Sequence, residues 1–122
     1  MLWVRIPLAL LATIIWEDKM GYYDNPVEEP QKYGFIEVVA EGDLAERNYD
    51  FAVFAVLRKE NGLYLSTDSG CSCPSPWESH TADDFTGPLT AEQVREEVLS
   101  LWSGGYAPVP EEDIMESLRA VV

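Results

Sequence analysis

Positive charge is scarce in this sequence: eight lysines and arginines stand against 22 aspartates and glutamates, which gives a formal net charge of −14. Phosphate backbones and anionic membrane surfaces would repel such a chain. Direct binding to DNA or RNA is therefore disfavoured, whereas a basic protein partner and, more weakly, a cation are favoured. The alternative is that the acidic residues serve only to keep a small protein soluble.

Cysteine and histidine are nearly absent as well. The two cysteines, Cys71 and Cys73, are separated by one residue, a spacing that closes a strained ring and rarely gives a structural disulfide. Their number excludes a secreted scaffold held together by disulfides, so a reducing cytoplasm is the expected compartment. The 122 residues, 47% of them hydrophobic, suffice for one domain with a modest core.

Long hydrophobic runs are missing too, because the apolar stretch from Ile6 to Trp16 is too short to cross a bilayer as a helix. Residues 16–20 back-translate to GGGARGA (R is a purine) shortly before an ATG, the pattern of a bacterial ribosome-binding site. We therefore expect Met20 to be the true start, residues 1–19 an apolar leader, and residues 20–122 a single α+β domain. In the competing interpretation, residues 13–16 form an extra edge strand. The mass of the protein expressed from its native upstream DNA distinguishes the two, and membrane attachment is expected only if residues 1–16 are present.

The strongest secondary-structure signal is a hairpin over residues 49–68. Residues 49–58 are apolar on both faces of an extended chain, which is typical of a central strand. Asn61-Gly62 tolerates the positive φ angles of a tight turn, and residues 63–68 return as the partner strand. Residues 35–40 have strand composition, so we expect a small antiparallel sheet of three or four strands. Glycines and prolines predict an irregular lead-in over residues 21–34 and a long loop over residues 69–89.

Two helices are expected after this loop. Thr90 and Gln93 form a capping box at the start of the first helix, and Gly104-Gly105 ends it. Its apolar stripe comprises Ala91, Val94, Val98, Leu101 and Trp102. The second helix is expected to start near Pro110 and to dock through Ile114, Leu118 and Val121. The fold class is therefore α+β, with one or two C-terminal helices packed on the sheet.

The densest group of reactive side chains lies in residues 68–84. Cys71, Cys73 and His80, together with a carboxylate, form a ligand set that zinc tolerates, so a small metal-binding module is the alternative function. Closed zinc sites usually pair cysteines two residues apart, however, and a second pair is missing. The same cysteines with His80 and Asp83 or Asp84 are also the residue types of a Cys-His-acid nucleophile, an interpretation that we rank last.

In the competing structural interpretation, Gly70 permits a sharp turn, the cysteines pack inside and the prolines stiffen the loop. Trp77 then either anchors the loop to the core or lies exposed as an interaction hot spot. The candidate contacts for a partner are Trp77, Asp83 and Asp84. The sequence has no phosphate-binding loop and no GxSxG nucleophile elbow, so it predicts no catalytic residues, no cofactor and no enzyme activity.

The segment DSGCSCPSPWE at residues 68–78 is the most specific pattern in the chain. Together with YDNP at residues 23–26, KYGF at residues 32–35 and YDF at residues 49–51, it resembles a family of small actinobacteriophage proteins of unknown function. The resemblance runs from about Gly21 to Trp102 and leaves out residues 1–19. It implies a phage origin and a location in the host cytoplasm, and it implies no activity and no catalytic residues.

The combined expectation is a non-enzymatic accessory protein that binds a protein of the host or of the phage. The motivation is the high negative charge, the small size and the absence of a recognisable catalytic motif. One variant of this hypothesis is a DNA mimic that occupies the basic cleft of a nuclease, a polymerase or a repressor.

Overall fold

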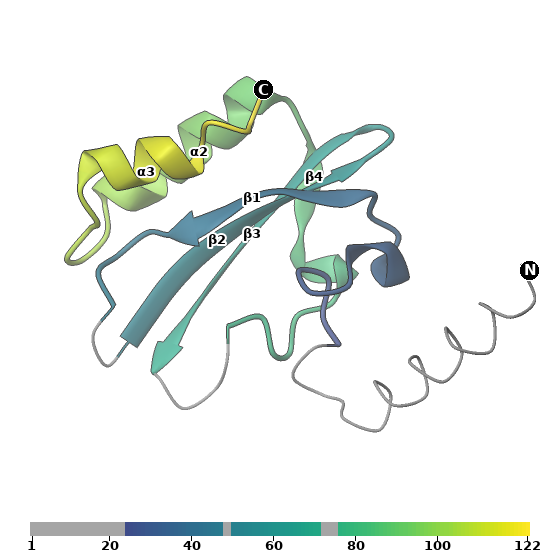
Figure 1. Ribbon diagram of the computed structural model, residues 1–122, viewed down its shortest axis with the longest axis horizontal. Coiled ribbons are helices and arrows are strands. Elements are labelled where there is room, and N and C mark those ends of the chain that lie inside the picture. Colours follow the sequence, from purple (N-terminus) through teal and green to yellow (C-terminus); the bar gives the residue numbers. More distant parts are fainter. Residues whose placement is uncertain (1–23, 48–49, 72–75) are drawn as a thin grey trace, which may run out of the picture.

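A computed structural model describes residues 24–47, 50–71 and 76–122 of the chain (Figure 1). Four strands form one antiparallel sheet in the order β1-β2-β3-β4. The strands are β1 (Glu37–Asp43), β2 (Asp50–Lys59), β3 (Gly62–Cys71) and β4 (Thr86–Leu89), and the α-helices are α2 (Ala91–Ser103) and α3 (Glu111–Ser117). Short 3-10 helices, η1 (Pro30–Tyr33) and η2 (Ala82–Asp84), complete the fold. The predicted α+β class, with C-terminal helices on a four-stranded antiparallel sheet, is confirmed.

Strands β2 and β3 form the predicted central hairpin. Their pairing runs from Lys59 opposite Gly62 at the turn to Asp50 opposite Cys71 at the far end, so β3 continues beyond the predicted end at residue 68. Gly62 has a φ of +146°, and a Cβ there would lie 2.9 Å from Pro88 Cβ. A larger residue at this position would therefore meet both backbone strain and a steric clash.

The prediction of a loop over residues 69–89 is wrong at both ends. The end of β3 occupies its beginning, and β4 occupies its last four residues. Strand β4 pairs with β3 through Leu65 opposite Thr86 and Leu63 opposite Leu89. Gly87 and Pro88 made the sequence predict a loop here, because both residues are rare in sheet interiors. They are tolerated here because β4 is an edge strand.

The helices cover one face of the sheet (Figure 1). Phe54 and Val56 of β2 point to this side and are fully buried under both helices. The buried helix residues are Val94 and Val98 of α2, and Ile114, Leu118 and Val121 in and just after α3. The three residues predicted to dock the second helix are thus all in the core. Leu101 differs from its prediction, because 40% of its surface remains exposed.

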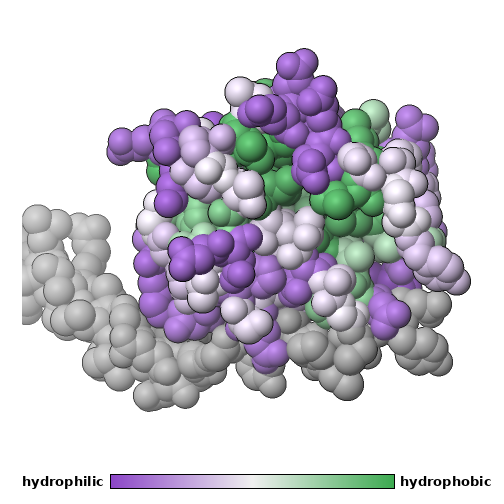
Figure 2. Space-filling model, turned by 180° about the vertical axis from the view of Figure 1, so that it is seen from behind, coloured by the Kyte–Doolittle hydropathy of each residue, from purple (hydrophilic) through white to green (hydrophobic). Residues whose placement is uncertain are grey.

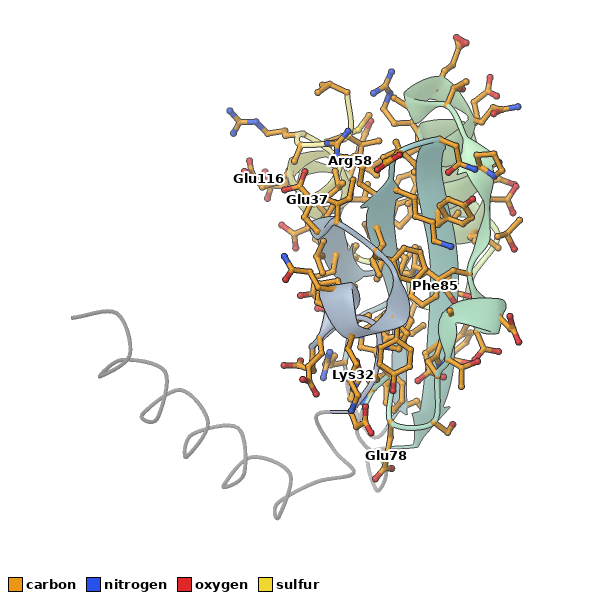
Figure 3. All side chains as sticks on the ribbon, turned by 90° about the vertical axis from the view of Figure 1, so that its right-hand side faces the viewer. Lys32, Glu37, Arg58, Glu78, Phe85 and Glu116 are labelled. Carbon is orange, nitrogen blue, oxygen red and sulfur yellow. The ribbon has the colours of Figure 1, made fainter. Side chains whose placement is uncertain are left out.

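The opposite face of the sheet is covered by chain segments without α-helix. Phe51, Val53, Ala55 and Leu57 of β2 pack there against Val27, Phe35, Trp77 and Phe85. Figure 3 shows Phe85 between the segment that precedes β1 and the segment that precedes β4. Because both faces of β2 are buried, its apolar character on both sides has a direct structural cause.

The described helices are short. None of those in residues 24–47, 50–71 and 76–122 has the length and apolar character needed to span a membrane. The predicted leader of residues 1–19, the start at Met20 and the alternative strand over residues 13–16 all lie outside the described residues, so they remain predictions.

Candidate functional site

The proposed cysteine site falls largely outside the described residues. Cys73 is not among them, and only the backbone of Cys71 is described, as the last residue of β3. Within the described part of the chain, no three histidine, cysteine, aspartate or glutamate side chains lie together so that they could hold a metal ion. His80 is described, and its surroundings indicate a different role.

His80 covers the free edge of β3 beyond the point where β4 begins. Its Nε2 lies 3.2 Å from the carbonyl oxygen of Thr67. Since a carbonyl oxygen only accepts hydrogen bonds, Nε2 carries the proton and donates it. The imidazole also packs edge-on against the ring of Trp77, with 4.9 Å between the ring centroids. The histidine thus supplies a side-chain donor where the sheet lacks a neighbouring strand.

Trp77 anchors the segment that carries His80. Only 4% of its surface is exposed, and its ring stacks with that of Phe85 at a centroid distance of 6.3 Å. Its backbone N–H donates to Oδ2 of Asp68 at 2.8 Å. Two roles were considered for Trp77, a buried anchor of the loop and an exposed contact for a partner. The structure shows it as a buried anchor, with its ring away from the surface.

Asp83 and Asp84 lie on the surface in η2. Oδ2 of Asp84 accepts a hydrogen bond from the backbone N–H of Thr81 at 2.7 Å, which forms a capping box with the Thr81 side chain. Asp83 is exposed beside it. The Asp84 carboxylate therefore stabilises a turn, and it also borders the groove described next.

A groove of about 860 Å³ lies between α2 and the β3–β4 side of the sheet. Three leucines supply its apolar lining, namely Leu65 of β3, Leu89 of β4 and Leu101 of α2. Three carboxylates also line it, namely Asp84 of η2 and Glu96 and Glu97 of α2. Its remaining lining is polar: Ser66, Thr67, His80, Thr86 and Gln93. On the face seen from behind in Figure 2, apolar and hydrophilic side chains likewise lie side by side.

The basic residues of the described chain are engaged elsewhere. Arg5 and Lys19 lie outside the described residues, which leaves six of the eight lysines and arginines. Four form surface ion pairs: Lys32 with Asp24, Arg47 with Asp43, Arg58 with Glu37, and Arg119 with Glu116. Figure 3 shows Arg58 beside Glu37 near one end of the sheet, with Lys32 near the other end.

The other two cations are held by neutral groups. Lys59 lies over the rings of Phe35 and Tyr64, with Nζ 4.9 Å from each ring centroid. Arg95, the basic residue of α2, donates to the carbonyl oxygen of Val121 and is not among the residues that line the groove. The negative charge of the groove is therefore not compensated by a lysine or arginine in its lining.

Among its site candidates, sequence reasoning named two residues of this groove: His80 as a candidate metal ligand or catalytic base, and Asp84 as a candidate contact for a partner. It missed that Glu96, Glu97 and Leu101 share a site with them, because the groove depends on how α2 packs on the sheet. One signal was present in the sequence: Leu101 lies at the edge of the apolar stripe of α2, four residues after Glu97 and therefore next to it on the helix surface.

Comparison with known families finds a match over most of the chain. A family model described as a domain of unknown function (DUF7574) matches residues 24–122. The match includes all the described strands and helices. No curated protein and no solved structure matches the chain.

Proposed function

This chain belongs to the family described as a domain of unknown function (DUF7574), and from its side chains we propose that it is a non-enzymatic accessory protein that binds a basic protein. The supporting observation is that its lysines and arginines are held by contacts within the chain. All six lysines and arginines of residues 24–47, 50–71 and 76–122 contact carboxylates, aromatic rings or a backbone carbonyl of the same chain. With a formal charge of −14 on the whole chain, the surface offers excess carboxylates to a partner.

The resemblance of the DSGCSCPSPWE loop to actinobacteriophage proteins extends this proposal. We propose that the protein is encoded by a phage and acts in the cytoplasm of the host. Its partner is then a basic protein of the host or of the phage. If the partner also binds DNA, competition between DNA and this protein would identify it as a DNA mimic.

The proposal is tested by capture of partners on the immobilised full-length protein from lysate of infected and uninfected host cells. The captured protein is identified by mass spectrometry, purified, and titrated against this protein at increasing sodium chloride concentrations. We expect an affinity that falls steeply with salt, because the Debye length shrinks from about 30 Å at 0.01 M to about 10 Å at 0.1 M. An affinity unchanged by salt would contradict binding through the acidic surface.

A further inference from the structure

We infer that the groove between α2 and the β3–β4 side of the sheet docks a short basic segment of a protein that carries aliphatic side chains between its lysines or arginines. The inference rests on the proposed function, and it assigns the binding to one part of the acidic surface. Three features of the groove support it: its apolar lining, the spacing of its side chains and its charge.

Part of the apolar lining is exposed, although Leu65 within it is buried. Val94 and Val98 of α2 are completely buried, whereas Leu101 on the same predicted stripe is 40% exposed and lines the groove. Leu89 of β4 lines the groove as well and is only partly buried. An aliphatic side chain that covers these leucines would remove apolar surface from water, which contributes about 25 cal/mol for each Å² buried.

The spacing on α2 places one carboxylate and one aliphatic side chain four residues apart. Gln93, Glu97 and Leu101 follow one another at intervals of four residues along the helix. An interval of four residues corresponds to about 6 Å along the axis. A partner segment therefore needs a cation and an aliphatic group about 6 Å apart. Residues i and i+4 of a helix satisfy this requirement, and residues i and i+2 of a strand nearly do so.

The negative charge of the groove favours a basic protein segment over the other ligands that could bind there. Asp84, Glu96 and Glu97 line it, and a lysine or arginine does not. A second copy of this chain would bring a further charge of −14, and nucleic acid would bring its phosphates, so both would be repelled. A bare metal ion lacks a cluster of three ligands in the described part of the chain. A basic protein segment is attracted by the carboxylates and also covers the leucines.

The test uses synthetic peptides of about 14 residues, long enough to form helix, titrated into the full-length protein by calorimetry at low salt. One peptide has lysine and leucine four residues apart, and the second replaces each leucine by alanine at the same charge. We expect the lysine–leucine peptide to bind more tightly than the lysine–alanine peptide. Equal affinities, or no binding of either peptide, would overturn the inference.

Two matched variants locate the binding. Glu96→Gln/Glu97→Gln removes two adjacent carboxylates from the groove, and Glu111→Gln/Glu112→Gln removes two adjacent exposed carboxylates from α3. We expect the groove variant to weaken binding of the lysine–leucine peptide by roughly three- to tenfold, and the α3 variant to weaken it by less than twofold. Similar losses in both variants would show diffuse attraction and overturn the inference.

A third variant tests the apolar contact. Leu101→Ser should reduce the affinity for the lysine–leucine peptide towards that for the lysine–alanine peptide, and leave the latter unchanged. Failure of the inference is distinguishable from failure of the proposed function. Suppose that the groove variants bind the peptides as tightly as the wild-type protein does, but that the natural partner binds with a steep salt dependence. The proposed function then stands, and its site lies elsewhere on the acidic surface.

Discussion

Trp77 combines a buried ring with a backbone conformation that bulky residues rarely adopt. Its φ is +71°, in the left-handed region, which costs a residue with a large side chain on the order of 1–3 kcal/mol. The hydrogen bond from its N–H to Asp68 and the contacts of its ring with His80 and Phe85 hold it there. The segment that borders the groove is therefore fixed by one strained anchor.

Because of this conformation, we expect the glycine variant of Trp77 to be more stable than the alanine variant, the reverse of the usual order. Trp77→Ala should lower the free energy of unfolding by about 3–5 kcal/mol, because the ring leaves a cavity. Trp77→Gly should cost about 1 kcal/mol less than Trp77→Ala, because glycine adopts a positive φ without strain. Urea denaturation measures both. The same pair of substitutions at Trp102, in the regular helix α2, should show the opposite order. A glycine variant less stable than the alanine variant at position 77 would refute the assigned backbone conformation.

Asp24 provides a residue-level prediction about pH. Its Oδ1 accepts hydrogen bonds from Lys32 Nζ at 2.8 Å and from the hydroxyl of Tyr33 at 2.7 Å. These two hydrogen bonds, that of Lys32 first, lower the pKa of the Asp24 carboxyl below its ordinary value of 3.8. Because the folded carboxyl binds its proton less tightly than the unfolded one, the contact stabilises the fold above about pH 3.8, and that contribution is lost as the pH falls through the folded pKa.

The pKa of Asp24 can be followed by the NMR shift of its carboxyl carbon. We expect a midpoint below 3.8 in the wild-type protein and a higher midpoint in Lys32→Met. Arg58→Met removes a cation from a different ion pair and should leave the Asp24 midpoint in place. A midpoint unaffected by Lys32→Met would mean that the ion pair does not persist in solution.

At the scale of elements, the docking of α3 on β1 depends on Gly42. A Cβ at this position would lie 2.4 Å from Oγ and 2.8 Å from Cβ of Ser117. Rotation of the serine side chain can move its Oγ but not its Cβ, so the helix itself would have to shift. The contact therefore fixes how closely α3 approaches the sheet.

Gly42→Ala should accordingly destabilise the protein by about 1–3 kcal/mol, the usual cost of overpacking. Ser117→Gly removes the obstructing Cβ, so the double variant should be more stable than the sum of the single effects predicts. A double-mutant cycle measured by chemical denaturation gives this coupling. Ser117→Ala is the control, because it keeps the Cβ and should give much less relief. Additive effects in Gly42→Ala/Ser117→Gly would contradict the close approach.

Elements specified by local patterns were predictable from the sequence. The hairpin follows from the apolar faces of residues 49–58 and from the turn residues after them. Helix α2 follows from its capping box, in which Gln93 N lies 3.1 Å from Thr90 Oγ1. Strand β4 was not predictable, because its Gly87-Pro88 favours a loop and only pairing with β3 makes it a strand. The groove was hidden for a related reason: it unites residues from η2, β3, β4 and α2, and their proximity is a consequence of tertiary packing.

At the scale of the whole molecule, the distribution of charge links stability and proposed function. The four ion pairs are all solvent-exposed, and such pairs typically contribute less than about 1 kcal/mol each. Meanwhile the net charge of −14 is a source of repulsion that compaction increases. A basic partner relieves this repulsion when it binds, so binding should also raise the melting temperature of the protein.

Salt should relieve the same repulsion without a partner. Raising sodium chloride from 0.01 M to 0.2 M weakens both the repulsion and the four ion pairs, but the uncompensated carboxylates outnumber the pairs, so the fold should gain stability. We expect a gain of about 1 kcal/mol, which raises the melting temperature by about 4 °C in calorimetry. The variant Glu96→Gln/Glu97→Gln/Glu111→Gln/Glu112→Gln carries four fewer negative charges and should show a smaller rise. A melting temperature that falls with salt would mean that the surface ion pairs outweigh the repulsion, and the excess negative charge would then not be available to attract a partner.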